Sequence, residues 1–237
     1  MRLSAPIYAL KRQAKLLARQ TDIPLHQALD RIAGEAGFQN WSHLASSFKS
    51  QSPARDVLAQ LAAGDLVLIA ARPGHGKTLL GLELASRAAQ FGRQGYFFTL
   101  EAHERDVEDY LSSLGIGPGS TDEVVVIDTS DEVSADYITA RLAPEPGPAL
   151  IVVDYLQILD QKRANPSLND QIDALKTYVA DTGAICALIS QIDRAFDLSG
   201  KAMPDISDVR LPNPLDLSAF SKSFFLHNGM VQLAQTA

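Results

Sequence analysis

Residues 71–78 of this 237-residue chain read Ala-Arg-Pro-Gly-His-Gly-Lys-Thr, a run whose residue types could bind a phosphate group. Gly74 and Gly76 would let the backbone curl so that successive N–H groups point at one anion. A helix predicted to start at Lys77 would direct the positive end of its dipole at the same anion. The spacing is typical of a phosphate-binding loop, although Ala71 stands where the pattern has its first glycine. The alternative is a glycine turn that only joins a strand to a helix.

The loop predicts a role for each of its residues. Gly74, His75 and Gly76 would bind phosphates through the backbone, and for His75 we expect the amide to matter more than the ring. Lys77 would reach the terminal phosphates during catalysis, and the Thr78 hydroxyl would bind Mg²⁺. The sequence therefore predicts Mg²⁺ as the cofactor and ATP as the substrate, although these motifs do not distinguish ATP from another nucleotide.

Three further polar residues follow apolar runs that read as strands. Asp154 could hold the magnesium ion, and the alternative is a helix cap or a turn residue. Glu101 could polarise an attacking water, or it could begin an acidic, solvated helix. The Gln191 amide could sense the γ-phosphate or position the water, or it could be an ordinary polar residue at a strand end.

Strands and helices alternate after residue 53. Continuous apolar runs indicate parallel strands covered on both faces, because such strands lack polar alternation. The strands are predicted at residues 66–70, 95–100, 124–127, 150–153 and 185–189. Helices are expected at residues 56–63 and 77–91, and Asn228-Gly229 between two apolar runs predicts a β-hairpin. We therefore predict an α/β fold with a mostly parallel sheet.

The first part of the chain has a different character. Residues 1–52 show only helical periodicity, which predicts a small all-α module before an α/β domain at residues 53–237. Seven basic and three acidic residues give residues 1–54 a charge of +4, which leaves −11 for the rest of a chain of net charge −7. The α/β domain is therefore not a general polyanion binder. The basic module would suit DNA or an acidic partner, or it would act as a docking or oligomerisation cap.

Composition excludes several other classes. No apolar run reaches the roughly 18 residues that span a bilayer, so we expect no membrane partner. The sole cysteine, Cys186, rules out a disulfide framework and a cysteine zinc site. It lies in an apolar run, where we expect it to be an inert core residue. A cytoplasmic location is the default expectation.

Taken together, the motifs resemble the RecA-like ATPase domain of the DnaB-type replicative helicases, a group related to RecA and KaiC. The match covers about residues 55–226. It is specific because Asp-Tyr-Leu-Gln, Phe-Phe-Thr-Leu-Glu and Ser-Gln-Ile-Asp-Arg occur in the family's order. The matching stretches are residues 71–78, 97–101, 151–157, 190–194 and 204–210.

The resemblance implies further roles. It implies that Glu101 is the catalytic carboxylate and that Gln191 is the γ-phosphate sensor. It also implies loops that bind single-stranded DNA, whose charges could grip phosphates or could be ordinary solvated loop charge. The candidate DNA-binding residues are Lys162, Arg163, Arg194, Lys201 and Arg210.

The sequence departs from the family in ways that bear on function. No basic residue follows Lys222, where the family's helicases carry a Lys-x-Arg pair that reaches the neighbouring subunit's nucleotide, and the family's N-terminal helicase domain is replaced by the helical module. We expect nucleotide binding to be kept, and fast hydrolysis to need an arginine from Arg194, Arg210 or a partner. The first hypothesis is therefore a Mg-dependent ATPase coupled to single-stranded DNA. The alternative is a nucleotide-gated regulatory protein with slow hydrolysis, either a homo-oligomer or a partner of a replicative helicase.

Overall fold

The computed structural model describes residues 7–49, 53–100, 107, 111, 125–143, 147–160, 162, 165–211 and 213–235. Glu101 and Arg163 lie outside these residues. The chain divides into two compact units whose main boundary lies between Pro53 and Ala54, and each is described by itself. That residues 1–52 and 53–237 are separate domains stays a prediction.

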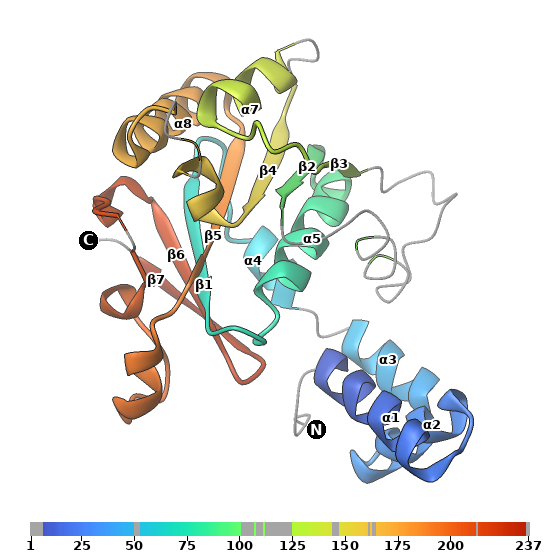
Figure 1. The fold of residues 1–237 in the computed structure, drawn as a ribbon. Helices are drawn as coiled ribbons and strands as arrows, with labels where there is room; N and C mark the ends of the chain where they lie inside the picture. The colour runs from blue at the N-terminus through green and yellow to red at the C-terminus, as the bar shows by residue number, and fades with distance from the viewer. Residues whose placement is uncertain are drawn as a thin grey trace. The chain divides into compact units, whose positions relative to one another are not determined.

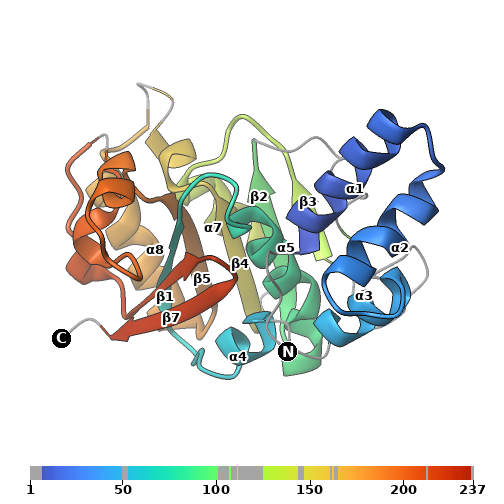
Figure 2. The ribbon, with the colours of Figure 1, turned by 90° about the horizontal axis from the view of Figure 1, so that it is seen from below.

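Residues 7–49 of the helical unit form three helices, α1 (Ile7–Thr21), α2 (Leu25–Glu35) and α3 (Trp41–Lys49) (Figure 2). Their apolar faces meet in a small core, which confirms the helical periodicity of the sequence. The Asn40 side chain accepts a hydrogen bond from the His43 amide at 2.8 Å and so caps α3. Asp30 on α2 accepts another from the Trp41 amide at 2.9 Å, which ties the two helices together. The buried core residues are Leu10, Ala14, Ala28, Ile32, Ala33 and Leu44.

The second unit is built on a seven-stranded sheet in the order β3-β2-β4-β5-β1-β6-β7 (Figure 1). The six strands from β1 to β6 pair in parallel, and β6 and β7 form a hairpin. Positive φ angles at Asn228 and Gly229 give the hairpin the turn that the sequence predicts. The strands are β1 (Leu66–Ala71), β2 (Gln94–Thr99), β3 (Val125–Asp128), β4 (Ala149–Asp154), β5 (Ile185–Gln191), β6 (Lys222–His227) and β7 (Met230–Gln235).

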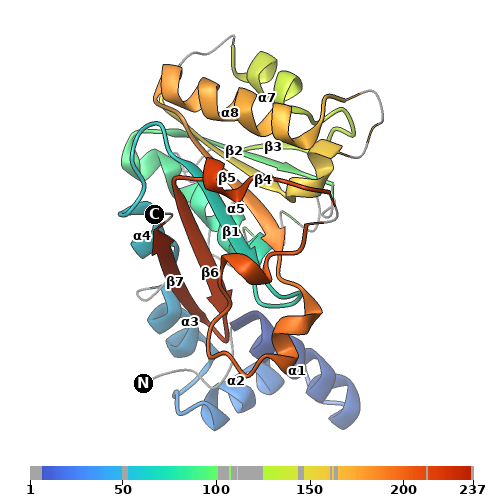
Figure 3. The ribbon, with the colours of Figure 1, turned by 90° about the vertical axis from the view of Figure 1, so that its left-hand side faces the viewer.

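Helices cover both faces of this sheet (Figure 1 and Figure 3). Alternate strand residues enter two separate cores: Leu68 and Ile151 lie on the side of α7 and α8, and Ile69 and Val152 lie on the side of α5. This arrangement explains the continuous apolar runs and confirms the predicted α/β fold. The helices are α4 (Pro53–Leu58), α5 (Lys77–Arg87), α7 (Ala135–Leu142) and α8 (Leu168–Thr182).

The prediction of a helix at residues 56–63 is wrong in its limits, because α4 ends at Leu58. Gly64 has a φ of 85°, and the Asp65 carboxylate accepts a hydrogen bond from the Ala62 amide at 2.6 Å. These contacts make residues 62–65 a turn that leads into β1. Among the described residues, no helix is both long enough and apolar enough to cross a bilayer.

Candidate nucleotide-binding site

The predicted phosphate-binding loop leaves the carboxyl end of β1 and enters α5. Gly74 and Gly76 have φ angles of 82° and 85°, a conformation that side chains disfavour. Gly76 is the residue before α5, and no side chain caps the helix there. The N-cap residue therefore offers no side chain that would compete with an anion at the start of α5. The His75 amide, predicted to bind phosphate, donates to the Arg72 carbonyl at 3.1 Å.

Close packing fixes α5 against the sheet behind this loop. A Cβ atom at Gly95 of β2 would lie 1.9 Å from the Ala85 carbonyl oxygen of α5. A Cβ atom at Gly81 would lie 2.5 Å from Ile189 Cδ1. Only glycine allows the helix and the strands to approach this closely, so Gly81 and Gly95 set the distance between α5 and the sheet.

The structure brings the predicted lysine and the predicted strand-end acid together. Lys77 Nζ lies 3.6 Å from Asp154 Oδ1, with side chains that are 8% and 0% exposed. The Tyr155 ring centroid lies 6.0 Å from the same ammonium. Burying two charges costs free energy that their attraction offsets only with excellent geometry, so such a pair suits a functional site better than a stabilising one.

The register of the sheet brings the other candidates to the same edge. Ala71 pairs with Gln191, and Asp154 pairs with both Ile189 and Thr99. The carboxyl ends of β1, β2, β4 and β5 therefore lie side by side, as parallel sheets require at a ligand crevice. Glu101 follows β2 but lies outside the described residues, so its role stays a prediction.

The polar groups fit Mg²⁺ bound together with phosphates. Thr78 lies in the first turn of α5 and is partly buried, directly after Lys77. Hydroxyl and carboxylate oxygens are ligands that Mg²⁺ accepts, and the ion usually keeps several waters or phosphate oxygens. No group of three His, Cys, Asp or Glu side chains among the described residues could hold a metal ion. That Thr78 and Asp154 hold the ion stays a prediction.

Sequence reasoning missed the role of Arg72 inside the loop. Its Nε lies 3.0 Å and its Nη2 2.8 Å from the two carboxylate oxygens of Asp197, a bidentate pair. Its Nη1 donates to the Ile192 carbonyl at 3.1 Å. The guanidinium holds the pKa of Asp197 below its ordinary value. No spacing pattern links residues 125 positions apart, so no signal in the sequence could have found this pair.

An aromatic group also adjoins the loop. The His75 ring stacks on the His227 ring with centroids 5.0 Å apart, and Phe196 meets His227 edge to face at 5.1 Å. Burial lowers the pKa of His75, and the charges of His227 and Arg72 lower it further. The loop therefore touches both the segment after β5 and the end of β6.

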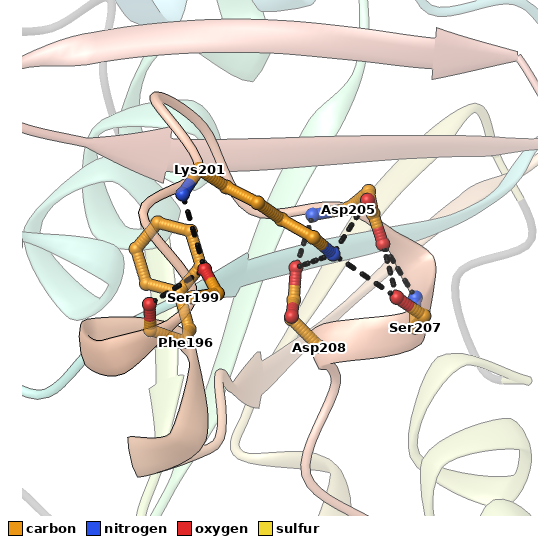
Figure 4. A network of polar contacts seen from close by, with 6 residues as sticks. All are labelled: Phe196, Ser199, Lys201, Asp205, Ser207 and Asp208. Carbon is orange, nitrogen blue, oxygen red and sulfur yellow. Dashed lines mark hydrogen bonds and ion pairs between the residues drawn. The ribbon is translucent and has the colours of Figure 1, made fainter.

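The predicted DNA-binding residues fall into two groups. The Lys201 ammonium lies 2.9 Å from both the Asp205 and the Asp208 carboxylates (Figure 4). Lys162 forms ion pairs with Asp131 and Glu132. These contacts raise the pKa of each lysine and leave each ammonium less available to a phosphate.

Arg194 and Arg210 form the second group. Both residues are exposed, and neither side chain forms an ion pair within the described part of the chain. The two guanidinium groups are therefore the more accessible of the predicted cations. Arg163 lies outside the described residues.

Comparisons with known proteins agree with this geometry. Residues 55–208 match the family described as ATPase: KaiC. The replicative DNA helicases DnaB of Leifsonia xyli subsp. xyli and Geobacillus stearothermophilus are 24% and 23% identical over 66% and 82% of this chain. The alignments cover 41% and 47% of those proteins, so the chain spans less than half of the length of each.

A solved structure shows the same fold. A DnaB-like replicative helicase, described with its interactions with primase, aligns with a TM-score of 0.59 and 18% identity. The alignment covers 92% of this chain and 65% of that one. A glycine loop, a buried lysine–aspartate contact and a family match over most of the α/β unit thus lead to the same assignment. The chain belongs to the KaiC ATPase family and is a distant relative of the DnaB-type replicative helicases.

Proposed function

We propose that this protein binds Mg-ATP at the carboxyl edge of its sheet and hydrolyses it by attack of water on the γ-phosphate. The buried contact between Lys77 and Asp154 supports the proposal most strongly, because a cation and a carboxylate that could bind a metal ion meet beside the glycine loop. The bound ion would neutralise charge on the phosphates and orient them. Family membership supports the reaction class.

Each residue has a role in the proposed reaction. Lys77 and the loop amides stabilise the negative charge that develops on the terminal phosphate. Thr78 and Asp154 hold the metal ion, and Glu101 accepts a proton from the attacking water. Gln191 senses the γ-phosphate from the end of β5, where its backbone carbonyl accepts a hydrogen bond from the Arg210 amide at 2.7 Å.

Single-stranded DNA is the proposed effector. The exposed Arg194 and Arg210 support this, since guanidinium groups that form no ion pair with the described residues suit phosphate contacts. The same arginines could instead reach the nucleotide of a second copy of this chain or of a replicative helicase. DNA-stimulated hydrolysis that is lost in Arg194→Gln and Arg210→Gln would favour the DNA role. Stimulation that depends on protein concentration would favour a neighbouring subunit.

A nucleotide-gated switch is the second candidate. The tie between Arg72 and Asp197 favours it, because it joins the phosphate-binding loop to a surface segment. Such a protein would bind ATP, change shape and hydrolyse slowly. Tight ATP binding with negligible turnover, with or without DNA, would support the switch and contradict the motor-like ATPase.

The test is to measure ATP affinity and steady-state hydrolysis for the wild type, Lys77→Met and Glu101→Gln. We expect Lys77→Met to weaken ATP binding about a hundredfold and Glu101→Gln to keep binding but abolish turnover. Lys222→Met is the matched control, because Lys222 also pairs with an aspartate, Asp65, but at the opposite edge of the sheet. Equal ATP affinity in Lys77→Met and Lys222→Met would contradict the proposed site.

A further inference from the structure

The segment that follows β5 is closed into a loop at its base. The Ile192 amide donates to the Ala71 carbonyl at 3.0 Å, and Ile192 pairs with Val209 in an isolated bridge. The Asp193 amide donates to the Asp208 carbonyl at 2.8 Å. We call residues 192–210 the clasp segment. Both of its ends therefore lie beside the carboxyl end of β1, from which the phosphate-binding loop starts.

The clasp segment is held from inside by polar contacts (Figure 4). Lys201 bridges Asp205 and Asp208, and the Asp205 side chain accepts from the Ser207 amide at 2.9 Å. Its tip carries Leu198, which is 91% exposed. A small polar network thus stabilises the second half of the segment, and the first half presents an apolar side chain to solvent.

Arg72 ties the two loops together across the chain. It binds the carbonyl of Ile192 and the carboxylate of Asp197, at the start and in the first half of the clasp segment. The Arg72 carbonyl also accepts the amide of His75. If the His75 amide turns to bind a phosphate, it must leave that carbonyl, and the Arg72 backbone loses this restraint.

We propose that Arg72 is a positioning residue that carries the conformation of the phosphate-binding loop to the clasp segment and to Gln191. The inference rests on the proposed function, since it takes a nucleotide phosphate as the ligand of the loop. Closure of the loop on a polyphosphate displaces Arg72, and the bidentate pair moves Asp197 and the Leu198 tip with it. The same tie sets the position of Gln191, which directly precedes Ile192.

The first experiment needs no nucleotide. Amide hydrogen exchange is measured in residues 193–198 of the wild type, Arg72→Gln and Asp197→Asn. We expect exchange to be about fivefold faster in both variants, and the double variant to be no faster than either single one. Arg93→Gln is the matched control, because Arg93 also binds backbone carbonyls, of Ala149 and Gly183, elsewhere in the fold. Unchanged exchange in Arg72→Gln would overturn the tie, whether or not ATP binds.

The second experiment uses a dye at the tip. Leu198→Cys can be labelled selectively, because the sole natural thiol, Cys186, is fully buried. We expect Mg-ATP to change the fluorescence of the dye, and Arg72→Gln to abolish that change while the ATP dissociation constant moves less than about threefold. Arg72→Lys keeps the charge without the bidentate geometry, so it restores only part of the response.

The outcomes separate the two proposals. If the dye on Leu198→Cys, with Arg72 intact, does not respond to Mg-ATP although calorimetry shows that ATP binds, the coupling is overturned and the proposed function remains intact. A wild type that does not bind ATP would overturn the proposed function.

In steady-state kinetics, Arg72→Gln should lower kcat about tenfold with little change in KM, because Gln191 is misplaced and the phosphates are still bound. An equal loss in Arg93→Gln would show a merely structural effect and overturn the positioning role.

Discussion

The phosphate-binding loop and the clasp segment lie at the same edge of the sheet but are held by different forces. Behind the loop, α5 packs backbone to backbone against β2, and almost every neighbour is apolar and fully buried. The clasp segment is anchored in the core by the buried Ile192 and Phe196, and its outer part is held by ion pairs and hydrogen bonds among partly exposed side chains. Apolar close packing tolerates almost no displacement, whereas exposed polar contacts exchange readily with water. The helix behind the loop is therefore fixed more firmly than the outer part of the clasp segment.

The largest effect is expected where the packing is closest. Gly95→Ala would place a methyl group 1.9 Å from the Ala85 carbonyl oxygen, so the helix or the strand must move. We expect a loss of about 3 kcal/mol or more in the free energy of unfolding, measured by urea denaturation. Gly147→Ala is the matched control, because nothing lies within 4 Å of its added methyl group, and it should change stability by no more than about 0.5 kcal/mol. Equal stability of the two variants would contradict the comparison.

A smaller effect is expected from breaking the clasp segment inside. Lys201→Gln removes the ammonium that joins Asp205 and Asp208. We expect little loss of global stability, because the ion pairs are partly exposed, and hydrogen exchange that is several times faster in residues 199–208. Exchange in β1 should not change. Faster exchange in β1 as well would show that the two regions do not differ in the way described.

Acid should act on the clasp segment in a defined window. Hydrogen bonds from Ser207 and Lys201 lower the pKa of Asp205 from 3.8 to about 2. A depressed carboxylate pKa stabilises the folded form above pH 3.8, and this contribution is lost as the pH falls towards 2. A carbon-13 NMR titration of the Asp205 carboxyl group should therefore have its midpoint near 2. A midpoint near 3.8 would show that the network does not persist in solution.

The smallest effect is expected from salt. Raising NaCl from 0.1 M to 1 M shortens the Debye length from about 10 Å to about 3 Å and weakens exposed ion pairs. Exchange in the clasp segment should become roughly twofold faster, with no change in β1 and α5. Exchange that becomes equally faster throughout the unit would contradict an electrostatic contribution that is specific to the clasp segment.

Local chemistry made much of the fold predictable from the sequence. Apolar runs located the strands, because strands buried on both faces carry no polar side chains in their interior. The Asn228-Gly229 turn and the Asn40 cap were predictable since each depends on residues within a few positions. The limits of α4 were not, because the segment between Leu58 and β1 contains a turn at residues 62–65 that depends on the side chain of Asp65.

The candidate site was predictable only where a motif carried it. Lys77 and Asp154 were predicted separately, and the fold brings them to 3.6 Å. Arg72 and Asp197 meet because two parallel strands end side by side, which no spacing in the chain reveals. The acidic partners of Lys201 were within reach of inspection, since Asp205 lies four residues away. A basic loop residue should be assigned to DNA binding only after nearby carboxylates that could pair with it have been considered.

The packing at Gly81 also constrains how this chain can diverge. A side chain there would meet Ile189, Val152 and Phe97, which come from three different strands. A single substitution at Gly81 would have to be matched by smaller residues at more than one of these positions, and each intermediate sequence would be less stable. Proteins that descend from this one should therefore keep the glycine while the sequences of exposed loops change. A glycine at this position is thus better evidence of common descent than of shared activity.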